Sequence, residues 1–254
     1  MKKYLAIAAL MMASVCASAQ SKPEPYFSFR ELPNMLKWCP APPDTAGAAF
    51  TYDIMQYMWG KEMRHNKERA DIAVRDAVYS LECIAQEFSE PFGLKISEDE
   101  TPEIWKLLRD AKATCENISG FPKFYYKRKR PFVRFQEPTA TPEFEPELRR
   151  NFSYPSGHTI LGWASALLLT EINPERADTI LARGMMYGES RVIVGAHWQS
   201  DVDAGRLAAA AAYARMHTSE RFLEQMRLAR QEFRVKTGLA TIIEMKAYRK
   251  SRSK

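Results

Sequence analysis

Apolar residues recur at helical spacing along most of this chain, and no stretch shows the apolar–polar alternation of a half-buried strand. The helical pattern begins near Phe50 and continues to about Val235. Of the 254 residues 46% are hydrophobic, which is enough for a chain of this length to bury its own core. No internal repeat is present. The sequence therefore predicts an all-α fold, a single-domain helical bundle.

The expected helices follow from this spacing and from capping residues and prolines at their ends. Thr101 and Pro102 have the types favoured at a helix start, and residues 131–150, rich in Pro and Glu, predict a loop. We expect helices over 52–59 and 70–84, from Thr101 towards Ile118, from Ser156 to Thr170, from Asn173 to about Gly188, and over 201–216 and 219–235.

The first nineteen residues have the pattern of an export signal. Lys2 and Lys3 precede an apolar stretch over 4–15, and the small residues at 17–19 predict cleavage before Gln20. No later stretch reaches the roughly 18 apolar residues that a membrane span needs. We therefore expect a periplasmic or secreted protein without stable membrane insertion.

The chain divides into four predicted segments. They are a signal peptide (1–19), a Pro-rich N-terminal arm (20–49), a helical domain (50–236) and a basic C-terminal tail (237–254) that frays near its end. The net charge of +6 suits an anionic ligand and is too small to indicate nucleic acid.

Three cysteines remain after the signal, Cys39, Cys83 and Cys115. An oxidising compartment permits one disulfide and one spare thiol, and the sequence does not decide the pair. We lean to Cys83 with Cys115, because both lie in helical patterns. Without a CxxC pair, a structural zinc site is not expected.

Three short clusters carry the residue types of an anion-binding catalytic site, although each alone is a weak signal. They are Lys123 followed after six residues by Arg130-Pro131, then Pro155-Ser156-Gly157-His158, then Ser190-Arg191 followed after five residues by His197 and after three more by Asp201.

A phosphate monoester needs fixed cations and N–H donors around its oxygens. Lys123, Arg130 and Arg191 can supply three cations. Ser156 and Gly157 stand at a predicted helix start, where free backbone N–H groups favour an anion. The clusters together therefore predict a phosphate site.

His197 and Asp201 are four residues apart, which on a helix places them on one face. A carboxylate bonded to one ring nitrogen fixes the tautomer and leaves the other nitrogen's lone pair free to attack. We therefore predict that these two residues form a catalytic pair.

In order and spacing the clusters resemble the three-part signature of the type 2 phosphatidic acid phosphatase superfamily. The stretches 153–155, 162–164, 171–174 and 197–203 look like class A bacterial nonspecific acid phosphatases, with Phe152 standing where that family usually has Gly. The resemblance implies that His197 attacks phosphorus to form a phosphohistidine and that His158 protonates the leaving alcohol. One histidine must be neutral and the other protonated, which predicts a bell-shaped rate profile on the acidic side of neutrality.

The favoured function is a metal-independent, exported acid phosphatase of broad monoester specificity, with no cofactor. Neither HExxH nor His-x-His occurs. The alternatives are another enzyme of the superfamily, either a lipid or diphosphate phosphatase or a vanadate-dependent peroxidase, and a non-catalytic phosphate-binding protein. The expected partners are small phosphate monoesters, and both a monomer and a homo-oligomer remain open.

Overall fold

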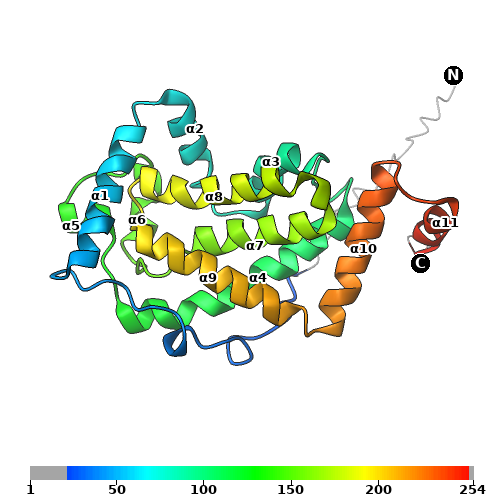
Figure 1. Cartoon of the computed structure of the whole chain (residues 1–254), viewed down its shortest axis with the longest axis horizontal. Helices are drawn as coiled ribbons and strands as arrows, with labels where there is room; N and C mark the ends of the chain where they lie inside the picture. The colour runs from blue at the N-terminus through cyan, green and yellow to red at the C-terminus, as the bar shows by residue number, and fades with distance from the viewer. Residues whose placement is uncertain (1–21, 252–254) are drawn as a thin grey trace, which may run out of the picture.

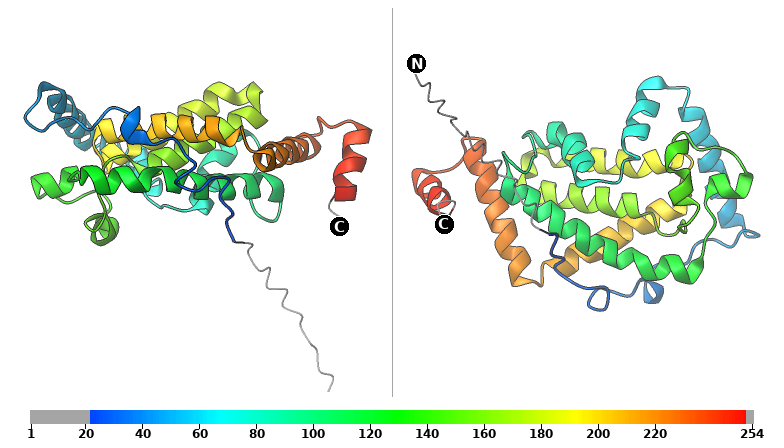
Figure 2. Two further views of the ribbon diagram at one scale, coloured as in Figure 1. Left: turned by 90° about the horizontal axis from the view of Figure 1, so that it is seen from below. Right: turned by 180° about the vertical axis from the view of Figure 1, so that it is seen from behind.

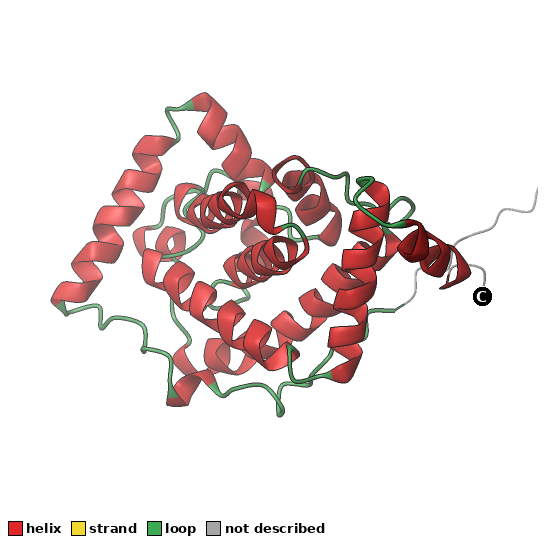
Figure 3. Cartoon of the chain, turned by 45° about the vertical axis from the view of Figure 1, so that its right-hand side comes forward, coloured by secondary structure: helices red, strands yellow, loops and turns green. Residues whose placement is uncertain are grey.

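A computed structural model describes residues 22–251 of the chain. Within that range the secondary structure is helical and contains no strand (Figure 3). The predicted all-α fold is therefore confirmed. The expected signal peptide and its cleavage site lie outside the described residues.

Three central helices run side by side and form the middle of the molecule (Figure 1). Gly162 on the first of them meets the ring of Tyr187 on the second so closely that a Cβ at this position would clash with it. A fourth, longer helix packs against this group. The four are α7 (Gly157–Ile172), α8 (Ala177–Ile193), α9 (Gln199–Met216) and α4 (Pro102–Tyr126).

The remaining helices cover the two ends of this core (Figures 1 and 2). At one end lie α1 (Ala48–Met63), α2 (Lys67–Arg75), α5 (Pro131–Phe135) and α6 (Glu145–Leu148). Towards the other end lie α3 (Leu81–Phe92), α10 (Glu220–Lys236) and α11 (Ile242–Ser251). Short 3-10 helices span Met35–Lys37, Pro142–Phe144 and Pro174–Arg176.

The helix predicted over 70–84 is wrong in one respect, because the chain leaves the helical path after Arg75 and resumes it at Leu81. Asp76 directs its carboxylate inward to the guanidinium of Arg183, and Ser80 starts the next helix by accepting the N–H of Cys83 at 3.0 Å. A buried ion pair and a new cap thus interrupt an apolar pattern that looked continuous. The loop predicted over 131–150 also contains α5, α6 and a 3-10 turn.

The start of α4 agrees with the prediction for Pro102, which is its first residue, but not for Thr101, whose side chain makes no cap bond. The first N–H groups of the helix are satisfied from elsewhere. Glu232 on α10 accepts the N–H groups of Glu103 and Ile104, each at 3.0 Å. The helix also continues beyond the expected end to Tyr126.

The predicted disulfide is wrong, because Cys39, Cys83 and Cys115 are all free thiols. Cys115 is buried in α4, whereas the Cys83 thiol donates to the carbonyl of Arg75, 3.3 Å away. The two sulfur atoms therefore belong to different environments.

The basic tail is not frayed up to residue 251, since α11 packs on α10. Tyr248 is buried and donates to Glu232 at 2.8 Å, and Arg234 pairs with Glu244 at 3.1 Å. Among the helices of residues 22–251, none combines the length and the apolar character that crossing a membrane requires.

Candidate active site

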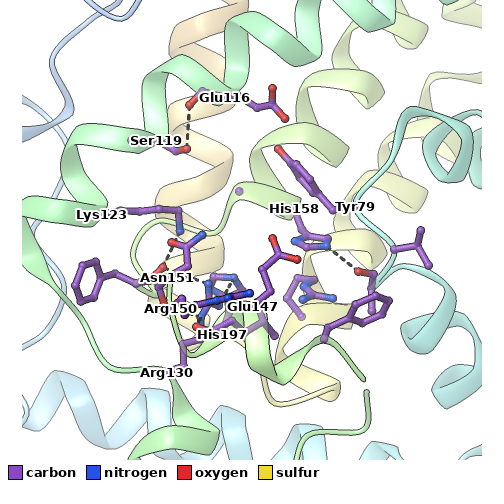
Figure 4. Close-up of a pocket in the computed structure, with 18 of the residues that line it drawn as sticks. Tyr79, Glu116, Ser119, Lys123, Arg130, Glu147, Arg150, Asn151, His158 and His197 are labelled. Carbon is purple, nitrogen blue, oxygen red and sulfur yellow. Dashed lines mark hydrogen bonds between the residues drawn. The ribbon is translucent and has the colours of Figure 1, made fainter. Parts of the chain in front are cut away.

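A cavity of about 780 Å³ opens where the C-terminal end of α4, the N-terminal end of α7 and the C-terminal end of α8 meet (Figure 4). Six of the eight residues predicted for the site line it. They are Lys123, Arg130, Gly157, His158, Arg191 and His197. Segments far apart in the sequence therefore meet at one cavity.

His197 and Asp201 are in contact, with Nδ1 of the ring 3.3 Å from Oδ2 of the carboxylate. The geometry differs from the expected helical face, because α9 begins only at Gln199. Trp198 is the cap residue, and its N–H donates to the same Asp201 oxygen at 2.9 Å. The carboxylate therefore closes the start of a helix and holds the histidine in the preceding loop.

The tautomer of His197 follows from its contact with Arg130. Nη1 of Arg130 lies 2.9 Å from Nε2 of the ring. Arginine has no acceptor, so Nε2 must carry the lone pair and Nδ1 the proton that points to Asp201. The ring thus presents an unprotonated nitrogen on the side of the cavity cations.

Sequence reasoning missed the residues that support Asp201. Ser153 donates to its Oδ2 and Arg128 to its Oδ1, each at 2.5 Å. Arg128 also donates at 2.6 Å to Asp53, a fully buried residue of α1. In a sequence, a basic run such as 127–130 usually indicates a solvent-exposed face, so Arg128 was not predicted to be buried. The signal that could have revealed it is Asp53, an acidic residue among the core-facing positions of α1.

Backbone carbonyls, rather than carboxylates, hold two of the cavity cations. Nζ of Lys123 donates to the carbonyls of Phe152 at 2.9 Å and Pro155 at 2.7 Å. Arg130 donates to the carbonyls of Leu148 at 3.0 Å and Phe152 at 3.2 Å. These bonds fix both side chains without neutralising their charge, which leaves the cavity attractive to an anion.

Arg191 is 1% exposed, yet its Nε and Nη1 have no hydrogen-bond partner among the described residues. Buried donors without a partner cost about 1–3 kcal/mol each, more when charged. Because Arg191 lines the cavity, an oxyanion there would satisfy both donors.

Ser156 and Gly157, the two residues predicted to bind phosphate at the start of α7, lie in different surroundings. Ser156 is buried, donates its N–H to the carbonyl of Asp201 at 3.0 Å, and accepts the N–H of Thr159 at 3.3 Å. It caps the helix and is absent from the cavity lining. Gly157 does line the cavity, and an added Cβ would meet only Tyr79 Oη at 4.0 Å, so this side of the helix start is open.

His158 faces the cavity from the first turn of α7. Its Nε2 lies 3.0 Å from the carbonyl of Ala77, and its ring packs on Tyr79 with centroids 4.7 Å apart. A carbonyl only accepts, so Nε2 is protonated and the other ring nitrogen, Nδ1, is the one free for exchange with a ligand.

The cavity lowers the pKa of five side chains that we predicted to bind or react with phosphate. Burial, reinforced by neighbouring cations, lowers the pKa of His158 and of His197 well below the usual histidine value. Burial and Arg130 lower the pKa of Lys123 to about 7, and burial lowers that of Arg191 to about 10. Burial also lowers the pKa of Arg130 to about 9. A dianion would oppose all five shifts, because it stabilises the protonated forms.

Two aromatic side chains line the cavity opening, one of them directly after Lys123 in the sequence. Phe124 and Phe152 form an edge-to-face pair with centroids 6.0 Å apart and line the opening. Phe132 instead lies in the core, and Tyr126 packs on Tyr154. Within residues 22–251 no group of three or more His, Cys, Asp or Glu side chains could hold a metal ion.

Comparison with known proteins supports the same family. Residues 111–223 match the model of the PAP2 superfamily. The chain is 40% identical over 244 residues to a non-specific acid phosphatase of Providencia stuartii, covering 92% of this chain and 98% of the relative. It is 39% identical over 242 residues to a non-specific acid phosphatase of Salmonella typhimurium, covering 93% and 94%. The chain therefore belongs to the PAP2 superfamily and, within it, to the non-specific acid phosphatases.

Proposed function

We propose that the protein is an exported acid phosphatase that hydrolyses phosphate monoesters of broad structure through a phosphohistidine intermediate. One observation carries the proposal: His197, with an unprotonated Nε2, and Arg191, with two donors that have no partner within residues 22–251, line the same cavity. A nitrogen that can attack and donors that can hold the charged oxygens thus line the same cavity.

In the first step the phosphoryl oxygens bind Lys123, Arg130 and Arg191. Arg130 turns its Nη1–H from His197 Nε2 to a phosphoryl oxygen, which frees the lone pair of that nitrogen. The lone pair of His197 Nε2 forms a bond to phosphorus while the bond to the ester oxygen breaks. His158 donates the Nδ1 proton to that oxygen, and the alcohol leaves. Asp201 stabilises the positive charge that appears on the His197 ring.

In the second step a water molecule attacks phosphorus from the side that the alcohol has left. His158, now neutral, accepts a proton from the water, and the electron pair of the phosphorus–nitrogen bond returns to His197. Phosphate leaves, and both histidines regain their starting protonation states. The two steps need neither a metal nor an oxidant.

Broad specificity follows from the distribution of contacts. The cations and donors gather at the phosphate end, whereas the rest of the cavity of about 780 Å³ is open and partly apolar. The lining beyond the phosphate end mixes apolar side chains with polar ones such as Tyr79, Glu116 and Asn151. None of these polar groups is a cation fixed like Lys123 and Arg130, so the phosphoryl group supplies most of the binding free energy.

The decisive experiment replaces His197 with Asn. We expect loss of p-nitrophenyl phosphate hydrolysis by at least about 1,000-fold, because covalent catalysis disappears. Phosphate binding should remain measurable by calorimetry, since the three cations stay in place. Retained turnover by a folded variant would contradict the mechanism.

Two further measurements bear on the same proposal. Rapid quenching of the wild type with labelled substrate should trap a phosphoryl group on His197 that is stable in base and lost in acid. EDTA should leave the rate unchanged, and strong inhibition by EDTA would indicate a metal instead.

A further inference from the structure

A second buried charge cluster lies behind His158, between the end of α2 and α8. Asp76 is completely buried, and both of its oxygens accept from the guanidinium of Arg183, Oδ2 from Nη1 at 3.2 Å. Oδ2 also lies 2.7 Å from the hydroxyl of Ser190. Glu87 on α3 holds the other side of Arg183 at 3.0 Å. None of these side chains lines the cavity, so the cluster makes no contact with a ligand there.

The cluster nevertheless reaches the reacting groups through the backbone. Ala77 directly follows Asp76, and its carbonyl is the partner of His158 Nε2 at 3.0 Å. A carbonyl on Nε2 fixes the ring orientation and stabilises the protonated ring, in which Nδ1–H is the proton to be given away. The place of that carbonyl is set by where Asp76 is anchored.

The same anchor touches the other side of the cavity. Ser190 precedes Arg191 in the last turns of α8, so the hydroxyl that contacts Asp76 belongs to the same helical turn as the unsatisfied guanidinium. The Asp76 carboxylate therefore connects two segments: the one around Ala77, which contacts His158, and the end of α8, which carries Arg191.

We propose that Asp76, clamped by Arg183 and Ser190, is a positioning residue for the general acid. It holds the Ala77 carbonyl against His158 so that Nδ1–H points to the leaving oxygen. This inference rests on the proposed function, since it assigns a role in the first chemical step.

The test uses two esters that differ in their need for an acid. p-Nitrophenolate leaves without protonation, whereas the alcohol of glycerol 2-phosphate leaves only when protonated. For Asp76→Asn we expect kcat/KM for glycerol 2-phosphate to fall about 100-fold, the lower end of what a general acid contributes. For p-nitrophenyl phosphate we expect less than about a fivefold loss. The ratio kcat/KM is the right quantity because it reports the step that expels the alcohol.

Asp110→Asn is the matched control, because Asp110 is equally buried and paired, with Arg109 at 3.0 Å, but lies away from the cavity. Both variants should lose thermal stability, and only Asp76→Asn should change the ester ratio. Arg183→Lys, which keeps the charge and loses the forked contact, should shift the ratio in the same direction and serves if Asp76→Asn does not fold.

Equal losses on both esters, in whichever of these variants folds, would show a merely structural role and overturn the inference. A wild-type protein inactive on both esters would overturn the proposed function and the inference together. An active wild type with an unchanged ratio in the variants would overturn the inference alone.

Discussion

Arg191 is the residue whose surroundings favour an anion most, because two of its buried donors have no partner within residues 22–251. We predict that Arg191→Lys lowers kcat/KM about 10- to 100-fold and weakens inhibition by phosphate, since charged hydrogen bonds are each worth about 1.5–3 kcal/mol. Lysine keeps the charge but cannot present two fixed N–H groups. Steady-state kinetics give both quantities.

Arg227→Lys is the control for that change, because Arg227 is an exposed arginine paired with Glu224 and lies outside the cavity. Its kinetics should match those of the wild type. An Arg191→Lys enzyme as active as the control would show that the guanidinium does not hold the phosphoryl group.

The lowered pKa values make anion binding depend on pH. Lys123, with its pKa lowered by burial to about 7, is charged below that value and neutral above it, and His158 must gain a proton to stabilise an anion. Binding of a dianion therefore takes up protons, and affinity falls as the pH rises through about 7.

Sulfate is the suitable probe, because its own charge does not change over this range. Calorimetry in buffers of different ionisation enthalpy should show net proton uptake near pH 7.5. Lys123→Met should reduce that uptake, and a wild type that binds sulfate without uptake would contradict the predicted shifts.

Sequence spacing pointed to residues that line the cavity more readily than to the residues that support them. The clusters around Lys123, His158 and His197 are local patterns with a direct chemical meaning. The contacts of Arg128 with Asp53 and of Asp76 with Arg183 join different helices. No local pattern encodes such pairs, because they depend on how the helices pack.

At the scale of elements, the same limit explains the helix boundaries. The apolar pattern located α7, α9 and α10 within a few residues. α10 turns one apolar face to the core, whereas α7 is buried on nearly all sides. It joined α2 and α3 into one helix, because the buried carboxylate of Asp76 at the break is satisfied only by α8. The spacing of apolar residues does not predict which polar residues are buried by pairing with another helix.

Helix packing also yields a prediction at Gly60 of α1. A Cβ there would lie 2.7 Å from the carbonyl oxygen of Val192 on α8, a contact with backbone that cannot rotate away. Gly60→Ala should destabilise the fold by about 1–3 kcal/mol. That loss corresponds to a Tm roughly 2–12 °C lower, measurable by calorimetry.

Gly120→Ala is its counterpart, because nothing lies within 4 Å of a Cβ at this position in the middle of α4. It should raise stability by about 0.5–1 kcal/mol, since alanine favours the helix. Equal effects of the two changes would mean that α1 does not approach α8 this closely.

At the scale of the molecule, residues at one end of the central helices line the cavity. α11 lies beyond the other end of these helices (Figures 1 and 2). A chain ending at Leu239 loses α11 and with it the buried Tyr248. We predict a Tm lower by roughly 3–10 °C. We expect kcat/KM to change less than about twofold, because distant sites are energetically independent. A folded but inactive truncated chain would show coupling between the ends.

The carbonyl contacts of Lys123 and Arg130 bear on how this enzyme can diversify. Phe152 serves both cations through its main-chain oxygen, and that oxygen is present whatever side chain the position carries. The side chain at position 152 can therefore be exchanged at the mouth of the cavity while the main-chain contacts of Lys123 and Arg130 stay in place. Natural or laboratory selection can therefore change the side chain that faces the alcohol without changing the contacts that fix Lys123 and Arg130.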